Sequence, residues 1–183
     1  MTMKFSGKDY TGGGDYVTLD EGTYEVTLKA ANMYKNNKYQ SEELTNQISL
    51  VWDTGLLFET DAGREVEAAI NDSFINFTLN EKATLVKRLK ALLGAGFDPE
   101  TAEVEIELEG VDNLDDLKHW REGRATVTKF VVNGENLFGK AAIVTLVHTK
   151  KGDKTYANVD NVSAPVQARK TAVKRQAPAG APL

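Results

Sequence analysis

The chain has 183 residues and a net charge of −5, and with 41% hydrophobic and 27% charged residues its composition is typical of a globular domain. It contains no cysteine and only two histidines, which excludes disulfides and thiolate metal sites and leaves little for a zinc site, so we expect no metal and no cofactor. No apolar run approaches the length of a membrane span and no charged-then-apolar stretch opens the chain, so we expect no membrane contact and a cytoplasmic location.

Residues 1–21 are polar and contain three consecutive glycines, Gly12 to Gly14, which predict a flexible N-terminal arm. From Gly22 onward, the sequence GTYEVTLKAA alternates apolar and polar residues. This period of two is typical of a half-buried strand.

The segment ANMYKNNKYQ, residues 31–40, is expected to be a loop because its paired asparagines favour turns. Alternation resumes over residues 44–53 and predicts a second strand. Trp52 shares the parity of the apolar residues there, which favours burial over an exposed, base-stacking role. Residues 73–79 are rich in aromatic and β-branched residues and predict a third strand.

The clearest helix is predicted over residues 80–93, with Asn80 as its N-cap and Gly94 just beyond its C-terminus. Its apolar stripe consists of Leu85, Val86, Leu89, Leu92 and Leu93. Lys87, Arg88 and Lys90 lie off this stripe and are expected to form a solvated face.

Residues 97–138 form an acidic block with eleven acidic and four basic residues, a net charge of −7. Within it, residues 103–109 alternate apolar residues with glutamates and are consistent with an exposed strand, and residues 124–132 are a further strand candidate. We interpret the block as an insertion between the helix and the strands that follow.

Two apolar runs, residues 140–149 and 155–162, flank a polar turn that contains Gly152, and this pattern predicts a β-hairpin. Beyond Pro165 no core-forming run remains. Residues 166–183 carry four basic and no acidic residues, and we predict a disordered basic tail.

Without the acidic block, the predicted order is three strands, a helix and two strands. This is the order of an OB-fold, a five-stranded barrel, so the fold class predicted here is mainly β with one helix, OB-like, with an acidic insertion between the helix and strand four. A generic α+β sheet with the helix on one face is the alternative.

OB-folds bind ligands through strands two and three and the loops joining strands one to two and four to five. Here both loops are basic and aromatic within an acidic protein. Cations displace counterions from phosphates, and rings stack on unpaired bases. The candidate nucleic-acid-binding residues are therefore Tyr34, Lys35, Lys38, Tyr39, Trp52, Lys150, Lys151, Lys154 and Tyr156.

The runs FINFTLNEKATLVKRLKALLG and GKAAIVTLVHTKKGDKTYANVDNVSAP, together with the opening GTYEVTL, resemble phage-encoded single-stranded-DNA-binding proteins with an OB-type core. The resemblance spans about residues 20–165. It implies a binding domain over residues 22–165 and a role in phage replication or recombination. The basic tail departs from the acidic tail by which many such proteins recruit replication partners.

We therefore expect a non-catalytic protein that binds single-stranded DNA with little sequence preference. Replication or recombination proteins that meet the basic tail are further candidate partners, and a homo-oligomer is left open. Enzyme activity is not expected, because the chain holds no nucleophile elbow, P-loop or zinc-protease motif. The alternative is a phage accessory module that uses the acidic block and the basic tail to bind proteins.

Overall fold

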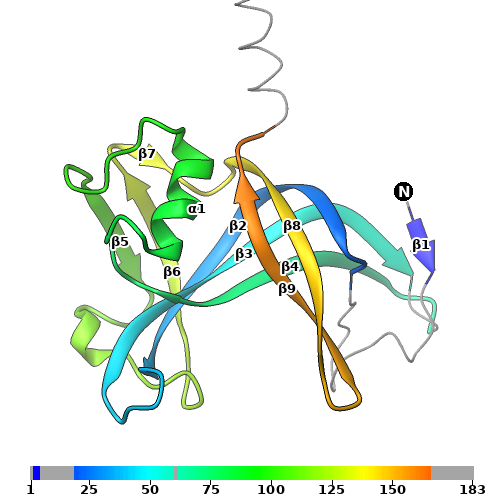
Figure 1. Cartoon of the computed structure of the whole chain (residues 1–183), viewed down its shortest axis with the longest axis horizontal. Coiled ribbons are helices and arrows are strands. Elements are labelled where there is room, and N and C mark those ends of the chain that lie inside the picture. The colour runs from blue at the N-terminus through cyan, green and yellow to red at the C-terminus, as the bar shows by residue number, and fades with distance from the viewer. Residues whose placement is uncertain (1, 5–18, 60–61, 166–183) are drawn as a thin grey trace, which may run out of the picture.

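The computed structural model describes residues 2–4, 19–59 and 62–165 (Figure 1). The predicted tail, and most of the predicted arm, lie outside these residues. The elements in chain order are β1 (Thr2–Lys4), β2 (Gly22–Asn37), β3 (Leu44–Glu59), β4 (Glu65–Asn76), α1 (Thr84–Leu93), β5 (Val104–Leu108), a 3₁₀ turn η2 (Leu114–Asp116), β6 (Ala125–Val132), β7 (Glu135–Asn136), β8 (Ala141–Lys151) and β9 (Lys154–Ser163).

Within the described residues, nine strands join in one strongly curled, mainly antiparallel sheet that forms a half-barrel (Figure 1). Strand β2 is its centre, with β3 along one edge, and with β8 and then β6 along the other. Strand β4 pairs with β3, and β9 pairs with β8. No ladder joins β4 to β9 in the described chain, so the curl does not close there. The arrangement is compatible with the predicted OB-like fold.

The core follows from the alternation seen in the sequence. In β2, Val26 and Leu28 are buried while Glu25 and Thr27 are exposed, and β3 buries Leu50 and Trp52. Each buried side chain of this size contributes about 1.5–3 kcal/mol to folding through the apolar surface it removes from water. Helix α1 seals one end of the half-barrel with the first residues of its predicted stripe, which are fully buried: Leu85, Val86 and Leu89.

Strand β2 is longer than the sequence predicts, since it runs to Asn37 and leaves only residues 38–43 as the connection to β3. The amide of Asn36, expected to favour a turn, instead donates a 3.0 Å hydrogen bond to Gln47 on β3. Cross-strand pairing of polar side chains thus extends the hairpin. As a result, Tyr34 and Lys35 belong to a strand and not to a loop.

The helix begins at Thr84, so the predicted N-cap at Asn80 is wrong. Asn80 shapes the preceding turn, because its side-chain oxygen accepts a 3.2 Å bond from the N–H of Lys82 and its carbonyl accepts one from Ala83. The predicted C-terminal stop is confirmed: Gly94 has φ 103°, a left-handed conformation that favours glycine, and its N–H bonds the carbonyl of Lys90.

The acidic block extends the same sheet and does not stand apart from it. Residues 103–109 contain β5, and β6 pairs with β5 and, at Asn32 and Met33, with β2. Strand β5 is therefore an edge strand whose glutamates face solvent.

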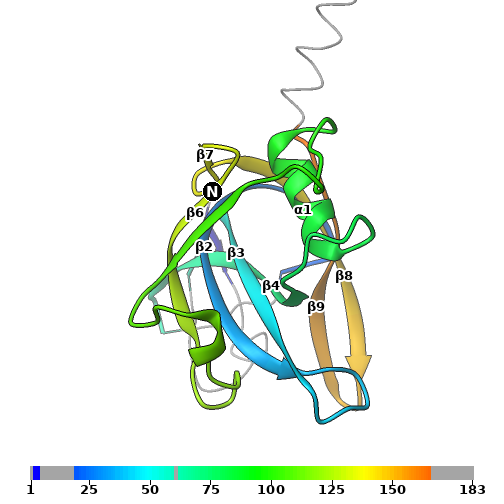
Figure 2. The ribbon, with the colours of Figure 1, turned by 90° about the vertical axis from the view of Figure 1, so that its left-hand side faces the viewer.

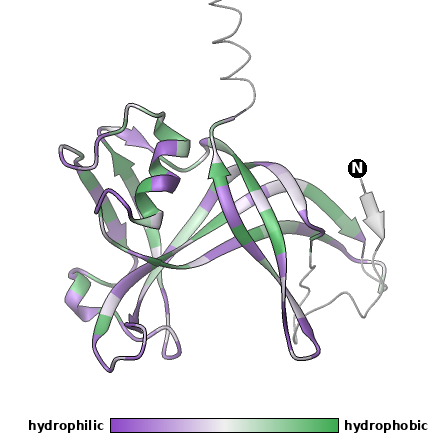
Figure 3. Cartoon of the chain, viewed as in Figure 1, coloured by the Kyte–Doolittle hydropathy of each residue, from purple (hydrophilic) through white to green (hydrophobic). Residues whose placement is uncertain are grey.

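The ends of the β2–β3 and β8–β9 hairpins point to the same end of the molecule, the lower end in Figures 1 and 2. Both ends are hydrophilic, in contrast to the apolar stretches of the strands behind them (Figure 3). No helix in the described part of the chain has the length and apolar character needed to cross a membrane.

Candidate nucleic-acid interface

Two of the residues proposed for the first binding loop have structural positions instead. Tyr34 is completely buried, and its hydroxyl lies 2.7 Å from Ser49 Oγ, so its ring is not available to stack on a base. The Lys35 ammonium donates a 2.6 Å hydrogen bond to the carbonyl of Asp115, which ties β2 to η2. Both differences follow from the extra length of β2.

Of the other proposed residues in this half of the chain, one is exposed, one is paired with a carboxylate and one is buried. Tyr39 is 89% exposed at the hairpin end, whereas Lys38 forms a 2.7 Å ion pair with Glu43. Trp52 is fully buried, as its parity predicted, and its indole N–H lies 3.4 Å from a carboxylate oxygen of Asp72. Trp52 is therefore a core residue and not a stacking platform in this structure.

The β8–β9 hairpin presents its proposed residues to solvent. Lys150, Lys151 and Lys154 are exposed, and Tyr156 is 42% exposed. No carboxylate of the described residues lies within ion-pair distance of these three lysines. Their positive charge is thus free to meet an anion.

The two hairpin ends share one end of the molecule, but they are well separated in Figure 1. The sequence placed the ligand between them. The residues that lie between the two hairpins in the sequence contribute a cluster of aromatic and basic side chains that was not predicted. The cluster consists of Phe74, His119, Trp120, Arg121 and Arg124, and we call it the Arg124 cluster.

Phe74 reaches this cluster through an irregularity in β4. The register between β3 and β4 shifts after Ile48, and Phe74 has φ 61°, which is rare for an aromatic residue. The bulge turns the Phe74 side chain outward, and it is 47% exposed. Strained backbone of this kind in a folded protein often marks a functional position.

The loop between η2 and β6 carries the remaining cluster residues and is fixed to β2. The N–H of Lys35 donates to the carbonyl of Lys118 at 2.8 Å, and the N–H of Trp120 donates to the carbonyl of Lys35 at 2.9 Å. His119 Nε2 lies 3.1 Å from the side-chain oxygen of Asn37. These bonds hold Trp120 beside Phe74, with ring centroids 5.4 Å apart and the planes nearly perpendicular.

The Arg124 guanidinium lies over three rings at once. Its carbon is 4.7 Å from the ring centre of Tyr34, 5.9 Å from that of Phe74 and 6.0 Å from that of Trp120. Arg121 lies over the same indole at 5.1 Å. Each contact is attractive because the electron-rich ring face stabilises a cation.

The cluster has the chemistry of a single-strand binding surface. Arg121 and Arg124 are exposed, and among the described residues neither forms an ion pair. The exposed ring of Phe74 and the partly buried ring of Trp120 offer stacking surfaces, and guanidinium groups without an ion-pair partner offer bidentate hydrogen bonds to phosphate. The sequence carried a signal in KHWREGR, residues 118–124, but the net charge of −7 over the acidic block hid it.

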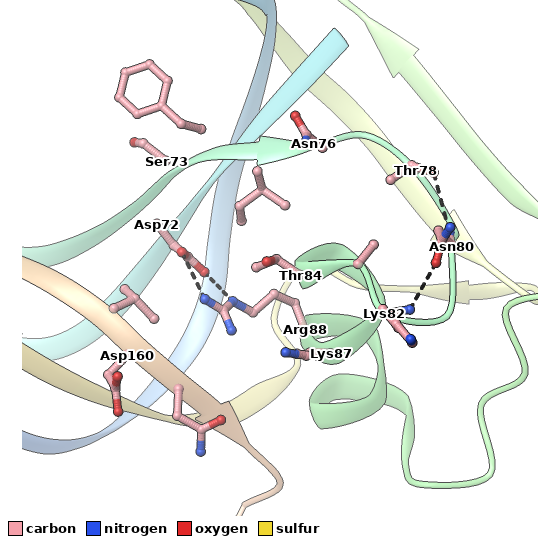
Figure 4. Close-up of a pocket in the computed structure, with 15 residues that line it drawn as sticks. Asp72, Ser73, Asn76, Thr78, Asn80, Lys82, Thr84, Lys87, Arg88 and Asp160 are labelled. Carbon is pink, nitrogen blue, oxygen red and sulfur yellow. Dashed lines mark hydrogen bonds and ion pairs between the residues drawn. The ribbon is translucent and has the colours of Figure 1, made fainter. Parts of the chain in front are cut away.

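Arg88, predicted to be solvated, is instead buried. Its Nε lies 2.7 Å from one oxygen of Asp72 and its Nη2 lies 3.3 Å from the other, and both side chains are nearly inaccessible (Figure 4). The desolvated guanidinium is tolerated because the carboxylate neutralises it within a bidentate pair. This ion pair connects α1 to β4 close to Phe74.

In the described part of the chain, no three histidine, aspartate or glutamate side chains are arranged to hold a metal ion. Comparisons of the chain with protein-family models, with curated proteins and with solved structures found no match.

Proposed function

We propose that this chain is a non-catalytic single-stranded-DNA-binding protein with an OB-like core. The observation that carries the proposal is the position of the Arg124 guanidinium over the rings of Tyr34, Phe74 and Trp120, of which the phenyl ring of Phe74 is exposed to solvent. A role in phage replication or recombination belongs to the same proposal and is supported only by the sequence resemblance.

The order and pairing of the elements support the OB-like assignment. Strands β2, β3 and β4, helix α1 and strands β8 and β9 follow in the expected order, and β2 pairs with both β3 and β8. Under this assignment, residues 97–138 are the insertion before the fourth barrel strand, and Phe74 lies on the third. The binding face of an OB-fold includes that strand.

The proposed mechanism combines base stacking with capture of phosphates. Bases stack on Phe74 and Trp120, and Arg121 and Arg124 bind the adjoining phosphates. The lysines of the β8–β9 hairpin and the exposed ring of Tyr39 extend the contact to both hairpin ends. Stacking uses the face that every base has, so little sequence preference is expected.

The test is a fluorescence-anisotropy titration of a labelled oligothymidylate, with an unlabelled duplex as competitor. We expect saturable binding that the duplex competes for poorly. Phe74→Ala and Trp120→Ala should each weaken binding by about 1–3 kcal/mol, or roughly 5- to 150-fold. Leu57→Ala removes an apolar side chain of similar exposure, 41% against 47% for Phe74, from the far part of β3 and should leave affinity unchanged. Equal loss in all three variants, or no binding by the wild type, would refute the proposal.

Intrinsic fluorescence provides a second readout. Trp52 is fully buried and Trp120 is only partly buried, so a base that stacks on the cluster should quench the emission of Trp120. We expect single-stranded DNA to quench the wild type and to leave Trp120→Phe unquenched. Quenching that persists in this variant would place the strand elsewhere.

A protein-interaction module is the second candidate, and one observation favours it. Among the described strands β5 pairs only with β6, which leaves β5 at the edge of the sheet, and the exposed glutamates at 103, 105 and 107 could attract a basic segment to that edge. This candidate predicts no saturable binding of the oligothymidylate, so the same titration separates the two.

A further inference from the structure

The seam between β4 and β9 contains a cavity of about 770 Å³. Its walls are the end of β4, the turn before α1, the first turns of α1 and residues 159–161 of β9 (Figure 4). It exists because β4 and β9 do not pair there. A cavity of this size is within the range of small-molecule binding sites and is large enough for one nucleotide unit.

The lining of this seam cavity carries an excess of positive charge. Arg88 and Asp72 lie in the wall and cancel each other within their ion pair. Lys82 and Lys87 also line the cavity, are exposed, and form no ion pair with any described residue. One further carboxylate, Asp160, opposes these two lysines, which leaves one net positive charge.

The remaining polar groups are suited to an anion with several oxygens. Thr78, Asn80 and Thr84 line the cavity with hydroxyl and amide groups beside the lysines (Figure 4). A lysine ammonium is a compact charge on a flexible stem with three donors, so two lysines can converge on one phosphate without a preformed fork.

The position of the cavity connects it to the Arg124 cluster. Phe74 lines the cavity and also contacts Trp120 and Arg124 in the cluster. A nucleotide whose base stacks on Phe74 therefore has its phosphate next to the seam.

We propose that the seam cavity is a phosphate subsite, in which Lys82 and Lys87 hold the phosphate of the nucleotide whose base stacks on Phe74. The inference rests on the proposed function and adds to it a contact with the DNA backbone that lies outside both hairpins. It implies that the strand passes from the Arg124 cluster toward α1.

The first test measures how oligothymidylate affinity depends on salt in Lys82→Gln/Lys87→Gln. Log K falls as log salt rises, and each lost phosphate contact makes this negative slope shallower by about 0.7 for a single strand. We expect a change of that size. Lys90→Gln/Lys129→Gln removes the same charge from two lysines outside the cavity and should keep the wild-type slope. Circular dichroism checks that both variants are folded.

The second test uses amide chemical shifts to locate small probes. Thymidine 5′-monophosphate and inorganic phosphate should both shift the amides of Thr84 and Lys87, and thymidine should not. Oligothymidylate should displace inorganic phosphate from these positions, which separates strand phosphate from a free-phosphate site.

The outcomes distinguish this inference from the proposed function. If Phe74→Ala loses affinity while Lys82→Gln/Lys87→Gln keeps both affinity and salt slope, the subsite is refuted and the proposed function stands. Phosphate-induced shifts without any oligonucleotide binding would refute the proposed function and, with it, the assignment of the cavity to a strand phosphate.

Discussion

The hydroxyl of the buried Tyr34 accepts a 2.8 Å hydrogen bond from the backbone N–H of Phe74. The same oxygen lies 2.7 Å from Ser49 Oγ, so the tyrosine proton is free to point at the serine. A side chain that the sequence placed in a loop therefore satisfies the donor that the β4 bulge leaves without a strand partner. The hydrogen bond to Tyr34 therefore helps to hold the exposed phenyl group of Phe74 in its position.

Replacing Tyr34 by phenylalanine should destabilise the fold by about 1–3 kcal/mol, because it leaves the partly buried N–H of Phe74, and Ser49 in the core, without the tyrosine hydroxyl. Urea denaturation measures the change. Tyr39→Phe is the matched control, since Tyr39 is 89% exposed, and its unfolding midpoint should match the wild type. An unchanged midpoint in Tyr34→Phe would mean that the bulge does not depend on this bond.

Substitutions at Phe74 should show the strain of its backbone directly. Because φ is 61° there, Phe74→Gly should be more stable than Phe74→Ala by about 1 kcal/mol. At Leu57, where no positive φ occurs, the order should reverse and alanine should be better by about 0.5–1 kcal/mol. The same sign at both positions, measured by chemical denaturation, would argue against strain at the bulge.

The buried Asp72–Arg88 pair should show strong coupling in a double-mutant cycle. Arg88→Met alone leaves a buried carboxylate without its cation and should cost about 3–5 kcal/mol of unfolding free energy. Asp72→Asn/Arg88→Met should cost much less than the sum of the two single changes. Additive losses would show that the two side chains act independently.

The exposed lysines of the β8–β9 hairpin should determine much of the salt dependence of DNA binding. If each lysine contacts one phosphate, Lys150→Gln/Lys151→Gln/Lys154→Gln should make the negative slope of log K against log salt shallower by about 2. The matched control is Lys29→Gln/Lys129→Gln/Lys140→Gln, whose lysines already pair with glutamates. A slope that becomes shallower by the same amount in both triple variants would indicate only a general effect of net charge.

Acid should remove a contribution of Asp53 to stability. A hydrogen bond from the N–H of Gly55 lowers the pKa of Asp53 below its usual value, and a hydrogen bond with the Glu67 side chain and the positive charge of Lys29 act in the same direction. The stabilisation is therefore complete above the unfolded pKa of about 3.9 and disappears as the pH falls through the lower folded value. Asp53→Asn should be less stable than the wild type at pH 6, and the difference should shrink toward pH 3. A constant difference would exclude this linkage.

The sequence predicted the strands and the helix where a regular period marked them, as in β2 from Gly22 and in the stripe of α1. It failed where tertiary pairing overrode local preference. Asn36 favours turns in isolation, yet Gln47 on the neighbouring strand accepts its amide and the strand continues. The burial of Arg88 could not be predicted either, because its partner Asp72 is sixteen residues away on another element.

The candidate site shows the same limit. The exposed lysines of the β8–β9 hairpin, Tyr39 and Tyr156 could be found from local composition. The Arg124 cluster could not, because it joins Phe74 of β4 to residues of the acidic block over the ring of Tyr34 on β2, and Phe74 depends on a positive φ that no sequence pattern announced. Whether either group of residues contacts DNA stays a prediction.

Strand β2 gives its second edge to β8 over its first half and to β6 over its second, and its register with β3 shifts between Leu28 and Ala30, where the partner changes. Because no ladder joins β4 to β9 among the described residues, the one ladder there that joins the β8–β9 hairpin to the rest of the sheet pairs β8 with residues 22–27 of β2. We therefore expect the β8–β9 hairpin to move more freely than the rest of the sheet. In amide exchange the hydrogen bonds between β8 and β2 should open well before those between β2 and β3. The β2–β3 and β8–β9 hairpins should then be able to change their spacing while the rest of the sheet stays folded.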